Sequence, residues 1–351
     1  MGVGGKQQVN KDATVPDNRV ITSADVAREA GVARSTVSRC LSGDGRISEE
    51  TRQRVLETAE RLGYQINQIA RSMNRRKSDL VGLVTSGLED PFRVQFLHHL
   101  ISAIQKIGYR PLVIDVSEPE HMSRSMLHLL QYQVAGVVVT SGSPSPEIGQ
   151  HFIRRNVPVV LVNRAGLLEG ADVVNCDNEA GGRLAAEALL AAGKRHLGFL
   201  NMSGGTYSGN ARGEAFVAAI APRLASGEVR FTPLGCRSAD YDGGFQAGVE
   251  ILGRPDAPDG IFCGKDHIAL GLMDAARFEL GLKIPQDLAV VGFDDITASS
   301  QRAYGLTTIR QCAEDLAELT VSRLARHISG PEGGAMARAV LPVELIRRTS
   351  A

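Results

Sequence analysis

From residue 80 onward, short apolar runs alternate with longer stretches in which apolar residues recur at a helical period. The first run, LVGLVT, precedes a helical stretch at residues 92–107, which Gly108 can close. Apolar strands that alternate with helices are typical of parallel sheets covered on both faces. The strands suffice for two such sheets, so we expect an α/β core of two lobes facing a cleft, with a ligand outside the carboxyl ends of the strands. The predicted strands are residues 80–85, 111–116, 136–140, 158–162, 173–176, 196–200, 260–263 and 289–293, and further predicted helices are residues 178–192 and 266–280.

The beginning of the chain has a different pattern, in which short helices follow one another closely. Thr22 or Ser23 can cap a first helix, and Gly31 can end it in the left-handed conformation. Directly afterwards, Val37 and Leu41 are spaced as on one face of a second helix. The sequence therefore predicts two helices joined by a tight turn.

A third helix at residues 48–62 starts with a capping serine and two acids, and its apolar side closes a small core. Two short helices joined through glycine form a helix-turn-helix, whose second helix enters the DNA major groove. The alternative is a three-helix cap with an incidental basic face, and the pattern alone leaves it open. Arginine can grip guanine and hydroxyls can hold phosphate, so the candidate base readers are Arg34, Ser35 and Arg39, and the candidate phosphate contacts are Thr36 and Ser38.

The formal net charge is zero, but the charges are unevenly distributed. Residues 1–78 carry 14 Lys and Arg side chains against 9 Asp and Glu, a net +5, and the remainder carries 25 against 30, a net −5. A basic segment of this size can supply the phosphate attraction of DNA binding. A solvated charged face remains the alternative on charge alone.

Several classes of protein do not fit the sequence. No run of about 18 apolar residues and no signal-peptide core occurs, so we expect a cytoplasmic protein without a membrane partner. The Gly-rich segments lack the dinucleotide fingerprint, and neither a nucleophile elbow nor a phosphate-binding loop is present, so we expect no enzyme and no cofactor. A periplasmic binding protein would need a signal peptide and would not use the N-terminal helices. The cysteines have no metal-ligand spacing and are expected to be small buried hydrophobes: Cys40, Cys176, Cys236, Cys263 and Cys312.

Three segments, DVAREAGVARSTVSRCLSG, ISEETRQRVLETAERLGY and NQIARSM, resemble in order and spacing the DNA-binding headpiece and hinge of the lac-repressor (LacI/GalR) family. The resemblance extends through the core to about residue 348, where the family has a periplasmic-binding-protein-like fold. It implies a homodimeric repressor on a palindromic operator, released or retained by a small-molecule effector. It places Arg34, Ser35 and Arg39 at base-reading positions and Thr22, Thr36 and Ser38 in the DNA-contacting set. Ala33 departs from the family pattern, which has a capping serine there.

The resemblance also implies a hinge that becomes helical only on operator DNA. Met73 stands where the family has a leucine that enters the central minor groove, and Asn67 and Ala70 belong to the same segment. Methionine is apolar and flexible, so it can serve as the wedge. The alternative is that Met73 only packs between domains.

The expected organisation follows from these patterns and the resemblance. Three crossings between the lobes are expected, near residue 177, near residue 307 and after residue 330. The expected parts are a disordered tail at 1–18, the helix-turn-helix headpiece at 19–66, the hinge at 67–78, a first lobe at 79–177 with 308–330, and a second lobe at 178–307 with 331–351.

The resemblance assigns effector contacts to residues at strand ends and on the helices that follow. Phe92 is expected against the ligand, with core packing as the alternative; Tyr241 is expected to stack on it; Arg212 and Asp294 are expected to hydrogen-bond its oxygens and hydroxyls. The full expected set is Phe92, Asn163, Arg164, Asp177, Arg212, Tyr241, Lys265, Asp294 and Gln311.

Lys265 departs from the asparagine that family members commonly carry at this position. With Arg164 and Arg212 expected nearby, the hypothesis is an effector with a carboxylate or phosphate, such as a sugar acid or sugar phosphate. The alternative is that Lys265 points to solvent or pairs with Asp266. The sequence does not decide whether the effector releases DNA or promotes its binding.

Overall fold

The computed structural model describes residues 21–42, 47–64, 78–116, 122–141, 145–165, 168–330 and 337–351. The chain divides into two compact units, Met1–Arg76 and Lys77–Ala351, each described by itself. Among the described helices, none combines the length and the apolar character needed to cross a lipid bilayer.

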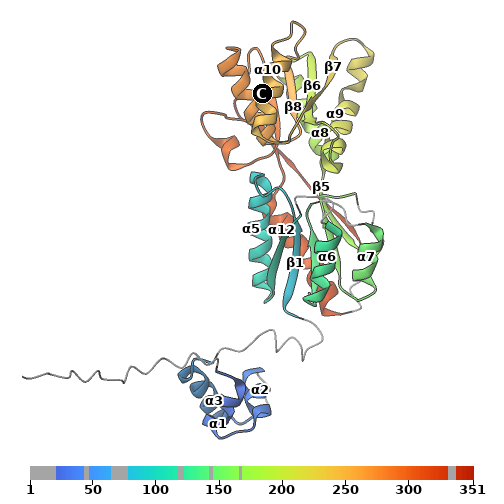
Figure 1. The fold of residues 1–351 in the computed structure, drawn as a ribbon. Helices are drawn as coiled ribbons and strands as arrows, with labels where there is room; N and C mark the ends of the chain where they lie inside the picture. Colours follow the sequence, from blue (N-terminus) through green and yellow to red (C-terminus); the bar gives the residue numbers. More distant parts are fainter. Residues whose placement is uncertain are drawn as a thin grey trace, which may run out of the picture. The chain divides into compact units, whose positions relative to one another are not determined.

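The described residues of the first unit form three helices around a small apolar core (Figure 1). Its helices are α1 (Ser23–Ala30), α2 (Arg34–Ser42) and α3 (Glu49–Arg61). One buried valine comes from each helix, Val26, Val37 and Val55. Gly31 ends α1 with a φ of 67°, in the region that favours glycine. The helices and the turn expected from the sequence are therefore present.

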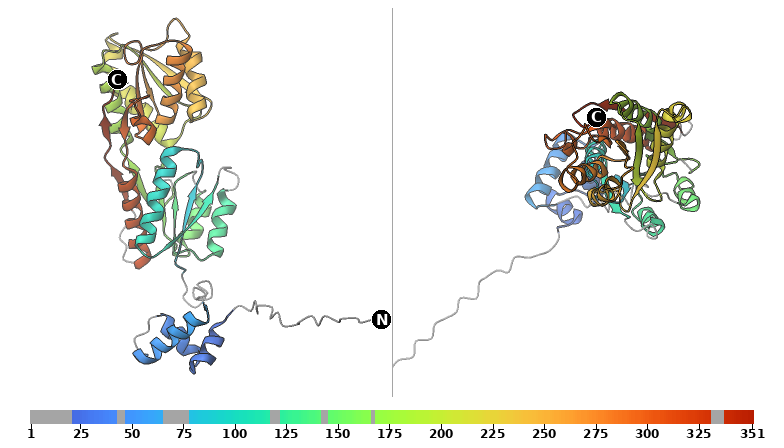
Figure 2. Two further views of the ribbon diagram at one scale, coloured as in Figure 1. Left: turned by 90° about the vertical axis from the view of Figure 1, so that its left-hand side faces the viewer. Right: turned by 90° about the horizontal axis from the view of Figure 1, so that it is seen from above.

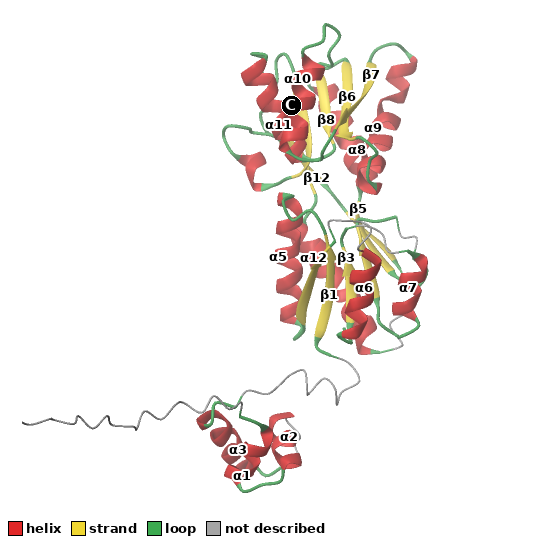
Figure 3. Cartoon of the chain, in the orientation of Figure 1, coloured by secondary structure: helices red, strands yellow, loops and turns green. Residues whose placement is uncertain are grey.

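The second unit consists of two α/β lobes, each built on a six-stranded sheet with helices on both faces (Figure 3). In the first lobe the strand order is β11-β5-β4-β3-β1-β2 and all the pairs are parallel. The strands are β1 (Leu80–Thr85), β2 (Arg110–Asp115), β3 (Gly136–Val139), β4 (Val159–Val162), β5 (Asp172–Cys176) and β11 (Arg338–Leu341), and the helices are α5 (Pro91–Lys106), α6 (Met122–Gln131), α7 (Pro146–Ile153) and α12 (Ala313–Ser329).

Successive residues of a buried strand in this sheet face opposite helix layers, as the pleat requires. Val138 of β3 packs in the cluster formed with α5 and α12, whereas Val137 and Val139 pack in the cluster formed with α6 and α7. Because both faces are covered, the strand is apolar at every position. This explains why β1, β3 and β4 were recognisable as continuous apolar runs.

In the second lobe the strand order is β12-β10-β9-β8-β6-β7, and β12 is antiparallel to β10. Helices α8 and α9 pack against each other, as do α10 and α11. The strands are β6 (His196–Met202), β7 (Arg230–Cys236), β8 (Gly260–Cys263), β9 (Ala289–Asp294), β10 (Thr307–Arg310) and β12 (Glu344–Ile346), and the helices are α8 (Asn178–Ala191), α9 (Tyr207–Ala225), α10 (Tyr241–Leu252) and α11 (Asp266–Asp274), the last continued by a π-helical turn at Ala275–Glu279.

Two of the expected lobe boundaries are wrong. Residues 308–310 belong to β10, which pairs with β9, so they lie in the second lobe and the crossing follows Arg310. Residues 338–341 form β11, which pairs with β5, so they lie in the first lobe and the last crossing follows Leu341. Asp177 N donates to Leu341 O at 2.8 Å, so two of the connections between the lobes run side by side (Figure 2).

Candidate DNA-binding surface and effector cavity

Helix α2 turns one face to the core of the first unit and exposes polar side chains on the other. Val37 and Cys40 are buried. The guanidinium of Arg34 reaches back to α1, where its Nε donates to Ser23 Oγ at 3.0 Å. Of the expected DNA-reading residues on α2, Arg34, Ser35, Ser38 and Arg39 are exposed and Thr36 is half-buried.

Thr22 precedes α1 as its N-cap residue rather than lying on α2. Its hydroxyl donates to Asp25 Oδ2 at 2.6 Å, and its backbone N donates to the same oxygen at 3.0 Å. These bonds stabilise the first turn of α1. The expected hinge residues Asn67, Ala70 and Met73 lie outside the described residues.

The second unit contains a cavity at the carboxyl ends of strands from both lobes, as expected for this topology. It is narrow, about 80 Å³, because side chains of the two lobes already interact across it. The first lobe contributes Asp90, Phe92, Arg93, Phe96, Thr140, Val162, Asn163 and Arg164, and the remaining lining residues are Asn201, Thr206, Ser208, Gly209, Arg212, Gly264, Lys265, Asp294 and Gln311.

Two of the strands end in the cavity on residues with positive φ. Asn163 follows β4 with a φ of 54°, and Asp294 ends β9 with a φ of 121°. Asparagine tolerates the left-handed region, but the backbone of Asp294 is in a sparsely populated conformation for a residue with a Cβ. Such strain persists where the surroundings hold the residue in place, and this is common at binding sites.

A chain of hydrogen bonds between buried and half-buried polar groups joins these strand ends. Asn163 Nδ2 donates to Gln311 Oε1 at 3.2 Å, and Gln311 Nε2 donates to Asp294 Oδ1 at 2.6 Å. Arg212 continues the chain, because its Nη1 lies 3.8 Å from the same Asp294 oxygen. The chain connects the first lobe to the second through the segment where the backbone itself crosses.

Arg212 is held rigidly by protein groups. Its Nε donates to Asn178 Oδ1 at 2.9 Å, its Nη1 donates to Gly264 O at 2.7 Å, and its guanidinium carbon lies 3.4 Å from the centre of the Phe293 ring. The residue is 4% exposed. A ligand therefore meets a guanidinium whose orientation is already fixed, which reduces the entropy lost on binding.

The carboxyl group of Asp294 is also almost fully buried. Burial raises its pKa to about 7, although the neighbouring Arg212 and Lys265 oppose the rise and Asp90 and Asp266 add to it. Near neutral pH the group can therefore accept a hydrogen bond from a ligand or carry a proton itself.

Two further cations line the cavity. Arg164 Nη2 donates to Thr140 O at 2.7 Å, and burial together with the charge of Arg93 lowers the pKa of Arg164 to about 10. Lys265 is the second, and its Nζ donates to Asp90 Oδ2 at 2.5 Å. Lys265 thus faces the cleft, and it pairs with Asp90 of the opposite lobe rather than with Asp266, whose carboxylate accepts from Ser299 and Thr308.

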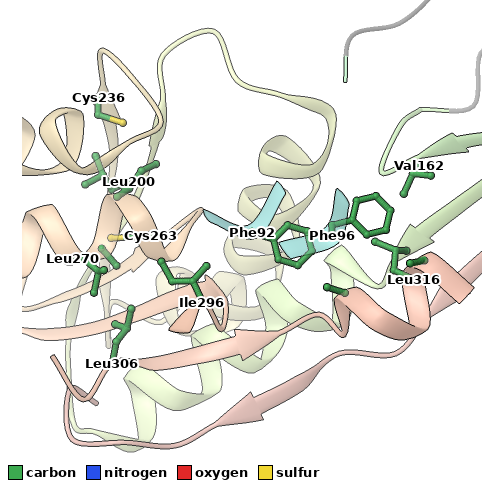
Figure 4. Packing of buried hydrophobic residues seen from close by; sticks show 14 of the residues in the cluster. Phe92, Phe96, Val162, Leu200, Cys236, Cys263, Leu270, Ile296, Leu306 and Leu316 are labelled. Carbon is green, nitrogen blue, oxygen red and sulfur yellow. The ribbon is translucent and has the colours of Figure 1, made fainter. Parts of the chain in front are cut away.

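Phe92 and Phe96 form the apolar part of the cavity wall. Their rings are stacked with centroids 6.3 Å apart, and both belong to an apolar cluster that also includes Ile296 and Leu306 of the second lobe (Figure 4). Phe92 is therefore both a lining residue and a core residue. The two alternatives raised by the sequence are not exclusive.

Two of the expected effector residues lie outside the cavity lining. Asp177 is the N-cap of α8, where its Oδ1 accepts from Ala180 N at 2.8 Å. Tyr241 begins α10, and its hydroxyl donates to Asp274 Oδ2 at 2.7 Å, which raises the pKa of Tyr241 to about 12. Both side chains are engaged in local structure.

Several lining residues were absent from the sequence-based set. Asp90 and Arg93 flank Phe92, and the Asp-Pro pair at residues 90–91 marks the helix start that brings both into the cavity. Asn201 is the penultimate residue of β6, so its position near a strand end was a usable signal. Thr206 caps α9 by accepting from Gly209 N at 3.1 Å.

No grouping of His, Cys, Asp and Glu suited to a metal ion occurs in the part of the chain that the structure describes. Four of the five cysteines are buried, as expected, whereas Cys312 is exposed at the start of α12, so that expectation is wrong for this residue.

Comparison with known proteins agrees with this architecture. Residues 22–67 match the bacterial regulatory proteins of the lacI family, and residues 186–351 match the periplasmic binding protein-like domain. The ribose operon repressor of Halalkalibacterium halodurans (strain ATCC BAA-125 / DSM 18197 / FERM 7344 / JCM 9153 / C-125) is 30% identical over 88% of this chain and 90% of its own length. The chain belongs to the lacI family of bacterial regulatory proteins. This lacI-family member is thus a transcriptional regulator and not an enzyme.

Solved structures show that the likeness extends over both units. The lac repressor dimer bound to operator and the anti-inducer ONPF superposes with a TM-score of 0.83 at 26% identity, covering 95% of this chain and 99% of that one. The complex of the transcriptional regulator CelR with cellobiose superposes with a TM-score of 0.67 at 27% identity, covering 94% and 100%. The fold class expected from the sequence, a helix-turn-helix headpiece with a two-lobed parallel α/β core, is confirmed for this lacI-family protein.

Proposed function

We propose that this chain is a cytoplasmic repressor of carbohydrate-utilisation genes that binds a palindromic operator as a homodimer and releases it when a sugar-class effector enters the cavity. The names of its relatives support the sugar class, since they include a ribose operon repressor and a regulator in complex with cellobiose. The lac repressor dimer on its operator supports the assembly and the DNA partner.

The observation that carries the proposal is that both lobes line one cavity and bond across it. Asn163 of the first lobe is bonded to Gln311 in the crossing, and Asp90 is bonded to Lys265 of the second lobe. A ligand that enters must exchange these bonds for its own. It can shift the equilibrium between lobe arrangements only by its different affinity for each.

The exposed face of α2 supplies the operator-binding side of the proposal. Arginine and short hydroxyl side chains on a helix that follows a glycine turn are suited to base edges and phosphates. Two such helices in a dimer contact half-sites about one helical turn apart, which predicts a palindromic operator.

The test begins with selection of duplexes from a randomised DNA library by the full-length protein, followed by anisotropy titrations on the selected duplex. We expect a palindrome bound about a thousandfold or more tightly than a scrambled duplex, and weakened binding with one class of sugar or sugar derivative. Selection of no palindrome would contradict the DNA-binding part of the proposal. Tighter operator binding with the effector would make the ligand a co-repressor.

A further inference from the structure

The ion pair between Asp90 and Lys265 closes the cavity from within. Lys265 Nζ lies 2.5 Å from Asp90 Oδ2, and the two side chains are 20% and 12% exposed. They are separated by 175 positions in the sequence and come from different lobes. The pair thus fills space in the cavity, and its carboxylate and ammonium groups are bonded to each other and not to a ligand.

One carboxylate performs two tasks in this arrangement. Asp90 Oδ1 caps α5 by accepting from Phe92 N at 3.0 Å and Arg93 N at 3.2 Å, and Oδ2 faces Lys265. Burial by itself raises the pKa of Asp90, but Lys265 and Arg93 outweigh that effect and hold it below the ordinary value. Asp90 is therefore an anion placed among cations.

The cavity nevertheless retains an excess of positive charge. Among the described lining residues, four are cations, Arg93, Arg164, Arg212 and Lys265, and two carry carboxyl groups, Asp90 and Asp294. Because burial raises the pKa of Asp294 to about 7, only Asp90 is fully anionic at neutral pH. The excess remains even with the internal ion pair in place.

Arg164 carries the least satisfied part of that charge. Its Nε is buried and has no hydrogen-bond partner among the described residues, although Nη2 is bonded to Thr140 O. A buried N–H without an acceptor is destabilising, and more so when the group is charged. A neutral sugar hydroxyl can accept from this N–H but leaves the charge uncompensated, whereas an anionic oxygen satisfies both.

We propose that the effector is an acidic sugar derivative whose carboxylate or phosphate binds Lys265 and Arg164 in the place that Asp90 fills in this structure. This inference rests on the proposed function and narrows its ligand class. Asp90 is then an internal competitor, and the effector exchanges an interlobe ion pair for bonds of its own. Phosphate and carboxylate share this chemistry, so the test contains both.

The test is calorimetric titration of the full-length protein with matched probes: glucose, glucuronate and glucose 6-phosphate, and ribose, ribonate and ribose 5-phosphate. We expect an acidic probe to bind at least about tenfold more tightly than its neutral counterpart, because a hydrogen bond to a charged group contributes about 1.5–3 kcal/mol. The difference between the two acidic arms identifies the anion.

Two variants test the exchange itself. Lys265→Asn should weaken the binding of the acidic probe about tenfold and change the affinity for the neutral probe by no more than about twofold. Asp90→Asn keeps the helix cap, since asparagine caps as well as aspartate. This variant should bind the acidic probe several-fold more tightly. That gain should vanish in the double variant, because the competitor acts through Lys265. Lys283→Asn and Asp256→Asn are the controls, as both side chains are exposed.

The outcomes separate this inference from the proposed function. If only neutral probes bind and they release the operator, the acidic-effector inference is overturned and the repressor function stands. If Asp90→Asn weakens the binding of the acidic probe, Asp90 does not compete with the effector, and the proposed exchange of its ion pair for effector bonds is overturned. If operator affinity responds to none of the probes, the sugar-effector part of the proposed function and this inference are both overturned.

Discussion

Gln311 donates from Nε2 to Asp294 Oδ1 at 2.6 Å while its Oε1 accepts from Asn163 at 3.2 Å, so the orientation of the amide is set from both sides. Gln311 is 4% exposed and Asp294 is 6% exposed. An amide in this orientation requires Asp294 Oδ1 to act as an acceptor. The lobes are thereby connected at a point where one carboxyl group can change its charge near neutral pH.

The pH dependence of stability provides a first prediction. The pKa of Asp294 is raised from 3.8 to about 7 by burial, so this group favours the folded state most at low pH, and that contribution is lost as the pH rises from about 4 to 7. Asp294→Asn removes the titration. The difference in free energy of unfolding, variant minus wild type, should therefore rise by a few kcal/mol as the pH increases from 4 to 8, since one pKa unit corresponds to about 1.4 kcal/mol.

This prediction is checked by thermal unfolding of both full-length proteins at pH 4, 6 and 8. Glu250→Gln, an exposed position on α10, is the control and should track wild type at each pH. The charged groups that influence the pKa of Asp294 are Arg212, Lys265, Asp90 and Asp266. A difference between Asp294→Asn and wild type that stays constant with pH would show that Asp294 does not titrate in this range.

The contact between α8 and α9 provides a second prediction. A Cβ at Gly182 would lie 2.3 Å from Arg212 O and 2.9 Å from Phe216 N, both backbone atoms that cannot move aside cheaply. Gly182→Ala must therefore separate the helices, and we expect a loss of about 1–3 kcal/mol in unfolding free energy. Because α9 carries Arg212, effector affinity should fall as well.

Denaturant unfolding and calorimetry measure the two effects of Gly182→Ala separately. Glu187→Ala, at an exposed position on α8, is the matched control and should change neither quantity appreciably. Unchanged stability of Gly182→Ala would mean that the close approach of the helices is not required.

The sequence predicted the continuously apolar strands well and missed several strands that contain polar or exposed positions, for a physical reason. β1 and β9 are covered on both faces and are therefore apolar at nearly every position. β7 and β11 contain exposed residues among half-buried ones, and β10 begins with two buried threonines, so none of them forms an apolar run. The absence of β10 and β11 from the prediction shifted the lobe boundaries.

The site residues were predictable where a residue's place at the end of a strand already puts it at the edge of the sheet. The resemblance to the family placed Asn163 and Asp294 in the site, and both lie where the rule that ligands bind at the carboxyl ends of parallel strands expects them. The partner of Lys265 was not predictable, because Asp90 meets it only through the closure of two separate lobes. Tyr241 lies outside the cavity lining in this structure, where its hydroxyl is bonded to Asp274, a contact that no local sequence pattern reveals.

The exposed arginines of α2 provide a third prediction. Arg34→Ala and Arg39→Ala should each weaken binding to the selected palindrome by about 10- to 100-fold, because a bidentate arginine–guanine contact is worth about 1–3 kcal/mol. Binding to a scrambled duplex should change much less. Arg61→Ala on α3, which removes an exposed ion pair with Glu29, serves as the control. Equal losses on both duplexes would reassign the arginines to phosphate contacts.

The last prediction separates a structural tyrosine from a ligand-stacking one. Tyr241 and Tyr304 both donate to Asp274 Oδ2, at 2.7 Å and 2.9 Å, and Tyr241 is outside the cavity lining. Tyr241→Phe keeps the ring and removes one hydrogen bond to a charged acceptor, so unfolding free energy should fall by about 1–3 kcal/mol while effector affinity stays the same. Tyr304→Phe removes the other bond and is the matched comparison.

A further variant, Tyr241→Leu, also removes the aromatic face, and calorimetry of effector binding then shows whether the ring contacts the ligand. If Tyr241→Leu weakens the effector and Tyr241→Phe does not, the ring contacts the ligand after the lobes rearrange, and the structural assignment of Tyr241 fails.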